Sequence, residues 1–330
     1  MRNWLPVAAA TVLIAGVAAA EPLTYTKDGA PIVYEKCLSC HRAGEIAPFS
    51  METFEGVRPW AKSIRKVVAS GEMPPWHADS DKTEFLNDRS LSPGQAETIV
   101  KWVDQGSREG NPADLPPTPE FHSEWAMGEP DMIFTADREF LVPAGDQYIP
   151  YQSIYFEPAI DEDLYIVEWE ILPSERAAVH HANLVRAPKK LDTVGIGEAV
   201  ASGGDYLGSF LPGARPFAYP AGTAYRIPAG NHVQIQVHYS GRDEDLTDQL
   251  RFGVRLAQGR IDKIVRTAGT DDYEFDIAPH DPDWVMNTEV TILYPVTVYS
   301  SGAHMHTRGS AYTMTAILPD GTEKWIADVP

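Results

Sequence analysis

The feature that most constrains this chain is a run of five residues, Cys37-Leu38-Ser39-Cys40-His41. Its two cysteines are the only ones in the 330 residues, so the chain is expected to be free of structural disulfides. Two thiols three positions apart can each bond one vinyl group of a haem, and a histidine directly after them can reach the iron. The run therefore predicts haem c attached through Cys37 and Cys40, with His41 as an axial iron ligand.

Other uses of a cysteine pair leave part of this pattern unexplained. A redox-active pair gives no role to His41, and a zinc site needs further ligands close by.

The sixth iron ligand is predicted to be Met73, because the two prolines that follow it hold the chain extended, as suits a loop over a haem face. Met51 and His77 are the competing candidates.

The first twenty residues have the composition of a secretion signal. Arg2 gives a positive start, residues 4–18 are almost wholly apolar, and Ala18 and Ala20 supply the small residues that precede a cleavage site. We therefore expect a periplasmic or secreted protein that has lost residues 1–20; an uncleaved N-terminal anchor is the alternative. No later segment is apolar enough to span a bilayer, so stable membrane insertion is not expected.

The charge of the chain narrows its range of partners. The formal net charge is −20 at pH 7, whereas a nucleic-acid partner needs a basic surface. We therefore expect no nucleic-acid binding. An acidic surface is compatible with a basic periplasmic electron donor, and a small reductant is the other source of electrons that we consider.

Composition divides the chain after the signal into three zones. Residues 22–110 carry the cysteine pair and helical patterns, residues 111–120 are rich in proline and predict a stiff linker, and residues 121–330 show alternating apolar runs. The sequence thus predicts a multidomain protein, with a small all-α domain followed by all-β structure.

Several elements can be placed inside these zones. One helix is expected at 59–71, and a second begins with a capping box at Ser92. The clearest strand is 233–239, where apolar and polar residues alternate. Two further strands are expected at 290–298 and 311–318.

Five of the ten histidines gather at three places in the β-rich zone. His304 and His306 lie two positions apart, so on a strand both side chains would face one way and could share a metal. His180 and His181 would face opposite ways on a flat strand, so a shared metal there needs a bend. His238 lies on the polar face of its own strand. Neutral imidazole suits copper and zinc, and the methionine beside His304 favours copper.

Two parts of the chain resemble known families. Residues 22–110 resemble class I cytochrome c domains, which implies an electron carrier. The motifs His-His-Ala-Asn-Leu at His180, Gln-Val-His-Tyr at His238 and Ala-His-Met-His-Thr-Arg-Gly at His304 resemble the copper type II, ascorbate-dependent monooxygenases. That family includes the peptide-amidating and dopamine-hydroxylating enzymes, and the second resemblance covers roughly residues 121–330.

The second resemblance implies a fold and a set of copper ligands. It implies two β-sandwich, jelly-roll-like domains with one copper each. The copper that takes up electrons would be held by His180, His181 and His238. The catalytic copper, at which dioxygen is activated and a substrate C–H bond is hydroxylated, would be held by His304 and His306.

The chain departs from the family in two respects. Family members have a methionine ligand well downstream of the paired histidines, whereas this sequence stops at Pro330. We therefore expect the chain to be a fragment, with one sandwich at 121–260 and only the start of the next at 261–330. Peptide-amidating members have an arginine two positions before the paired histidines, where this chain has Gly302, so a peptide substrate is not expected.

These observations lead to one functional interpretation and two alternatives. The first is a monooxygenase that hydroxylates a small molecule with electrons delivered through its own cytochrome c domain. The second is a non-catalytic electron-transfer protein whose β-rich zone binds copper or docks another oxidoreductase. The third is a zinc or copper hydrolase, which is ranked last because no His-Glu-x-x-His motif occurs.

Overall fold

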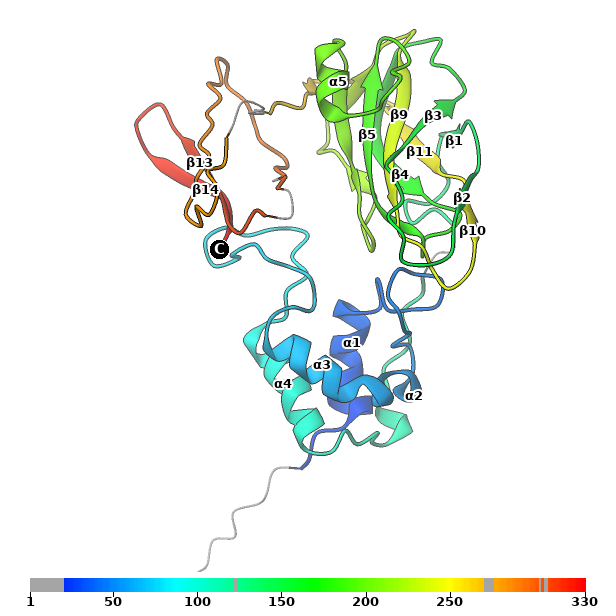
Figure 1. The fold of residues 1–330 in the computed structure, drawn as a ribbon, viewed down its shortest axis with the longest axis vertical. Coiled ribbons are helices and arrows are strands. Elements are labelled where there is room, and N and C mark those ends of the chain that lie inside the picture. Colours follow the sequence, from blue (N-terminus) through cyan, green and yellow to red (C-terminus); the bar gives the residue numbers. More distant parts are fainter. Residues whose placement is uncertain (1–20, 122–123, 270–275, 303, 306–307) are drawn as a thin grey trace, which may run out of the picture.

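The computed structural model describes residues 21–121, 124–269, 276–302, 304–305 and 308–330 (Figure 1). Most of the regular structure is β, arranged around one large curled sheet, and most of the few helices gather near the N-terminal end. The prediction of a β-rich chain after the linker is therefore confirmed. Within the described ranges, no helix is long and apolar enough to cross a membrane. The expected signal segment, 1–20, lies outside the described residues.

The helical region comprises residues 25–104. It contains a π-helical turn, a 3-10 turn and four α-helices, at Tyr25–Gly29, Arg58–Trp60, Ala30–Lys36 (α1), Phe54–Val57 (α2), Ala61–Ala69 (α3) and Pro93–Asp104 (α4). The helix expected at 59–71 corresponds to α3 and the turn before it. The capping box predicted at the start of α4 is confirmed, because the Ser92 side chain accepts from the backbone of Gln95 and the Gln95 side chain accepts from the backbone of Ser92.

The helices enclose a small apolar core of their own. Trp102 of α4 is 1% exposed and its ring centroid lies 5.9 Å from that of Tyr25. Leu38, inside the cysteine run, is fully buried in the same core. The cysteine run therefore starts from packed structure and not from a free loop.

The sheet of the β-rich region contains ten strands. Its order is β12-β8-β4-β11-β1-β3-β9-β5-β6, and β7 pairs with β4. Among the described residues, one strand pairing in this sheet is parallel, that of β12 with β8. The strands of this sheet are Met132–Ala136 (β1), Gln152–Glu157 (β3), Leu164–Leu172 (β4), Val179–Ala187 (β5), Asp205–Phe210 (β6), Phe217–Ala218 (β7), Thr223–Ile227 (β8), His232–Tyr239 (β9), Arg251–Leu256 (β11) and Lys263–Val265 (β12).

The alternation in β9 explains why this strand lies inside the sheet. Val233, Ile235 and Val237 are at most 2% exposed and pack into the main apolar core, as expected for one face of a period-two strand. The strand predicted at 233–239 is therefore confirmed. Three smaller elements accompany the sheet: a short helix, Ile196–Ala201 (α5), and a two-stranded ribbon of Phe140–Val142 (β2) with Leu246–Asp248 (β10).

The C-terminal part has much less regular structure. The prediction of a strand at 290–298 is wrong, because residues 276–302 form no helix or strand and nearly all their side chains are exposed. The alternation is present in the sequence, but a strand also needs a partner for its backbone groups and a core for its apolar face. The strand expected at 311–318 is confirmed as Tyr312–Ile317 (β13), which forms a hairpin with Glu323–Val329 (β14).

This hairpin touches the helical region, beside a loop near residue 80 (Figure 1). Lys82 Nζ lies 2.5 Å from a carboxylate oxygen of Asp328, and the backbone N–H of Asp79 donates to the Asp328 carbonyl oxygen at 2.7 Å. The chain therefore folds back so that its last strand meets its N-terminal third.

Candidate metal centre and haem-attachment segment

Three histidines, His180, His181 and His238, converge where β5 and β9 pair; we call them the histidine trio. His181 lies directly opposite His238 across the antiparallel pair. One ligand atom of each histidine lies within 4.8 Å of the others, and the ring centroids are 5.2–5.3 Å apart. Two nitrogens bound to one ion at about 2.1 Å can be no more than about 4 Å apart, so only small ring rotations are needed.

A β-bulge brings the two adjacent histidines to the same side. The register between β5 and β9 shifts between Val179 and His181. An extra residue in one strand bends that strand and redirects its side chains. The nearest ring nitrogens, Nδ1 of His180 and Nδ1 of His181, are therefore 3.1 Å apart instead of on opposite faces. This is the bend that a shared metal required.

The electrostatics of the trio favour the neutral form of His181 and His238. The pKa of His181 is lowered to about 4, first by burial and then by the positive charges that His180, His238 and His304 would carry. Burial and the neighbouring His180 also lower the pKa of His238. Neutral imidazole is the form that binds metal ions, so both rings are ready to act as ligands at pH 7.

One atom of the trio lacks a protein partner. Nδ1 of His238 is buried and makes no hydrogen bond within the described part of the chain. A buried polar atom without a partner costs folding free energy, which a bound metal ion would offset. The Tyr151 ring lies 5.0 Å from that of His238 and 5.7 Å from that of His181, so it covers one side of the trio. The trio fits a metal ion on these observations.

The second predicted copper pair is only partly described. His304 lies near the trio, since its charge contributes to the lowered pKa of His181, but His306 lies outside the described residues. Residues 301–302 and 304–305 belong to no strand, so the shared strand face expected for the pair is absent there. Across the described ranges, the trio is the only group of three or more His, Cys, Asp or Glu side chains close enough to share a metal.

The predicted haem-attachment segment, residues 37–41, forms a tight turn at the end of α1. The backbone N–H groups of Cys40 and His41 both donate to the carbonyl oxygen of Cys37, at 3.1 and 2.9 Å. Both thiols are free, and burial raises the pKa of Cys37 to about 12. Nδ1 of His41 donates to the Phe49 carbonyl oxygen at 3.2 Å, which leaves Nε2 for an iron ion. The residues present therefore fit covalent haem attachment.

The two candidate methionines differ in exposure. Met51 is 3% exposed within the helical core, and its backbone N–H donates to the carbonyl oxygen of His41. Met73 follows α3 and is 39% exposed. Packing in the core accounts for the position of Met51, whereas the Met73 thioether remains available as an iron ligand. His77, the other candidate, is exposed.

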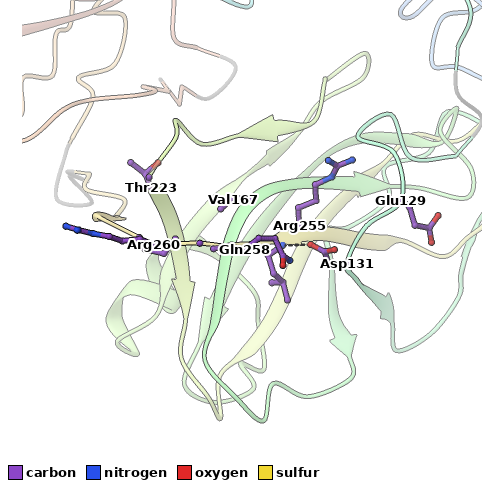
Figure 2. A pocket seen from close by; sticks show the side chains of 12 residues that line it. Glu129, Asp131, Val167, Thr223, Arg255, Gln258 and Arg260 are labelled. Atoms are coloured by element: carbon purple, nitrogen blue, oxygen red, sulfur yellow. Dashed lines mark hydrogen bonds between the residues drawn. The ribbon is translucent and has the colours of Figure 1, made fainter.

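A separate cavity lies on another part of the sheet. It has a volume of about 700 Å³ and contains none of the predicted site residues (Figure 2). Arg255 extends over it, with its Nε 3.4 Å from a carboxylate oxygen of Glu168. Half of its twelve lining residues are polar or charged: Glu129, Asp131, Thr223, Arg255, Gln258 and Arg260.

The sequence did not reveal two supporting residues. Tyr151 beside the trio and Phe49 beside His41 act through ring packing and a backbone carbonyl, neither of which leaves a motif. No family, curated protein or solved structure matches this chain. The geometry of the two sites is therefore the basis for a functional proposal.

Proposed function

We propose that this chain is an exported oxidoreductase that carries haem c and copper. The activity that we favour is that of a monooxygenase, which would hydroxylate a small molecule. The observation that carries the proposal is the histidine trio. Three imidazoles lie within 4.8 Å of one another on paired strands, and one buried nitrogen among them lacks a partner. A mixed imidazole and thioether environment, with Met305 next to His304 in the sequence, favours copper over zinc.

The helical region would be the cytochrome c domain. Cys37 and Cys40 would hold haem c covalently, with His41 and Met73 as its axial ligands. Haem held in this way supplies one-electron transfer at a potential that a methionine ligand raises. The carbonyl oxygen of Phe49 fixes the ring orientation of His41, and the buried Leu38 anchors the turn that presents both thiols.

The β-rich region would be the copper module. The trio would hold the copper that takes up electrons, and His304 with His306 would hold the copper that activates dioxygen. Copper held by imidazoles supplies one-electron chemistry toward dioxygen and a substrate C–H bond. The register of β5 and β9 fixes the trio in place, and Tyr151 restricts access to it from one side.

A second candidate function is an electron-transfer protein with a single copper. It is favoured by the lack of any second metal-binding group within the described residues, and by the open chain around His304. In this case the trio alone would bind copper, and another protein would carry out the chemistry. The number of copper ions per haem separates the two functions.

The test uses the full-length protein exported from cells that attach haem c. We expect one covalent haem, retained on a denaturing gel, and a mature mass that corresponds to cleavage after Ala20. Two copper ions per haem support the monooxygenase, one supports the electron-transfer protein, and none contradicts both. Copper electron paramagnetic resonance (EPR) should show nitrogen coupling that is weaker in His238→Ala, which lacks one of the three imidazoles.

A kinetic experiment then tests the activity. The reduced protein is mixed rapidly with dioxygen in the presence of candidate small substrates. Haem that reoxidises faster in the wild type than in His238→Ala supports the proposed electron flow, and equal rates contradict it. His232→Ala is the matched control, since His232 lies on the same strand but outside the trio. The physiological electron donor is proposed to be a basic periplasmic protein or a small reductant.

A further inference from the structure

The helical region meets the sheet beside the strand that carries two members of the trio. The first contact involves the loop after β6. The Arg89 guanidinium donates to the carbonyl oxygens of Pro212 and Gly213, at 3.0 and 2.8 Å. A Cβ atom placed on Gly213 would lie only 2.9 Å from Sγ of Cys40, so this loop touches the haem-attachment segment directly.

A second contact lies at the loop before β5. Glu45 is 7% exposed, with one carboxylate oxygen 2.5 Å from the Arg42 guanidinium and 3.8 Å from that of Arg176. Arg242 bridges the same two regions, since it donates to the carbonyl oxygen of Ala177 at 2.9 Å and also to that of Ile46. A buried carboxylate therefore faces arginines from both sides of the interface.

Both contacts lie next to the trio along the chain. Residues 176 and 177 precede β5, whose second and third residues are His180 and His181. β6 ends at Phe210, which pairs with Ala182, the residue after His181. The loop that touches Cys40 begins at the following residue. The two contacts thus flank the histidine end of β5.

The chemistry of these contacts fixes geometry. Regions of one chain that meet across a small, polar interface are expected to move relative to one another unless something holds them in place. Here guanidinium groups bind backbone carbonyl oxygens, whose positions are set by the strands on either side. The positive φ of Gly213, +69°, together with its contact with Cys40, leaves no room for a side chain at this point.

We propose that Arg89, Arg242 and Glu45 are positioning residues that dock the haem-attachment segment against the histidine end of β5. Docking holds Cys40 against the loop after β6, so that electrons would pass within one chain over a fixed separation. This inference rests on the proposed function for its purpose, but the docking itself is a property of the protein without copper.

The experiment compares the full-length, haem-loaded wild type with the double variant Arg89→Gln/Arg242→Gln. Arg226→Gln is the matched control, because its ion pair with Asp163 lies wholly within the sheet region. Small-angle X-ray scattering first measures docking in copper-free protein. We expect one compact arrangement for the wild type and the control, and a more extended, heterogeneous ensemble for the double variant.

Copper is then added, and the relaxation of the Cu(II) EPR signal by the ferric haem reports the separation of the two centres. We expect the enhanced relaxation to be lost in the double variant while haem and copper contents stay unchanged. Gly213→Val is a second variant, which should reduce the relaxation because its side chain would collide with Cys40, Ser39 and Arg89 at the point of docking.

The outcomes separate this inference from the proposed function. A wild type whose scattering requires independently moving regions overturns the docking, even if copper and haem bind as proposed. A double variant that keeps the compact arrangement and the relaxation also overturns it. Failure of the wild type to bind copper contradicts the proposed function, while the scattering still decides whether the regions are docked.

Discussion

The histidine trio and His304 lie in two parts of the molecule that differ in how they hold a side chain. The trio projects from β5 and β9, which pair along nearly their whole length over a core that includes Leu184 and Ile235, both fully buried. His304 follows residues 276–302, which belong to no helix or strand and are almost entirely exposed. Both parts carry potential copper ligands, but only one is held by a hydrogen-bonded register.

This difference shows what makes a group of ligands into a site. A set of metal ligands binds well when packing and hydrogen bonds hold it near the required geometry before the ion arrives. The trio has this support from the sheet and the bulge, whereas the described residues around His304, 301–302 and 304–305, belong to no strand. We therefore propose that the trio is the stronger of the two copper sites, and four predictions test the contrast between these two parts of the protein.

The largest contrast is expected in amide hydrogen exchange of the metal-free protein. Amides in the centres of β5 and β9 open only with much of the fold, whereas amides of residues 285–300 need no such opening. We expect exchange of the first group to be slower by roughly 10³-fold or more, given typical domain stabilities. Mass spectrometry of peptides from the two segments measures this ratio. Similar rates would show that the trio is not held rigidly.

Copper affinity should depend on the trio more than on any other histidine. His238→Ala removes one of its three ligands and should weaken copper binding by roughly 100-fold, at the upper end of what loss of a supporting residue costs. Competition with a chelator of known affinity measures the change. The control His232→Ala alters the other end of β9 and should bind copper like the wild type. Equal losses in the two variants would contradict the assigned ligands.

A matched pair of glycine substitutions compares the packing of the two parts. A Cβ atom at Gly208 on β6 would lie 2.5 Å from a ring atom of Trp169, whereas one at Gly302 meets nothing within 4 Å. Gly208→Ala should destabilise the metal-free protein by about 1–3 kcal/mol because the core has no room for the methyl group. Gly302→Ala should change stability by less than about 0.5 kcal/mol.

Urea denaturation of both variants measures these effects. Trp169 is 5% exposed and stacks near Phe217, so it cannot move aside without disturbing the core behind β6. A destabilisation by Gly302→Ala as large as that by Gly208→Ala would mean that the segment before His304 is packed in solution. The contrast between the two parts would then not hold.

The sequence predicted the residues of the trio but not how they meet. The apolar alternation of β9 predicted its strand, because each apolar residue there finds a core. Spacing predicted that His304 and His306 would face the same way on a strand. It also showed that His180 and His181 could share a metal only if their strand bends. The structure provides that bend through the register shift after Val179, a tertiary feature that no local pattern encodes.

The same limit explains the failed strand at 290–298. Its alternation resembles that of β9, but the sequence cannot show whether a partner strand and an apolar surface are available. The helical region was easier to predict, because the capping box at Ser92 is formed by neighbours in the chain. Local signals thus placed elements, and long-range pairing decided which of them could support a site.

The smallest predicted effect is a pH dependence confined to the trio. In the unfolded chain the pKa of His181 is near 6.5, whereas in the folded, metal-free protein it is lowered to about 4. Between these values the unfolded chain binds a proton that the folded protein does not, so stability falls as the pH drops from 6.5 to 4. Above pH 6.5 this group contributes no change.

The measurement is the difference in unfolding free energy between the wild type and His181→Gln across this range, in the presence of a metal chelator. The difference cancels the titration of carboxylates common to both proteins. We expect the wild type to lose about 1 kcal/mol more than the variant, a value reduced from the full shift because solvent screens a partly buried ring. Parallel losses in the two proteins would mean that His181 is as solvated as His304, and the two parts would no longer differ in this respect.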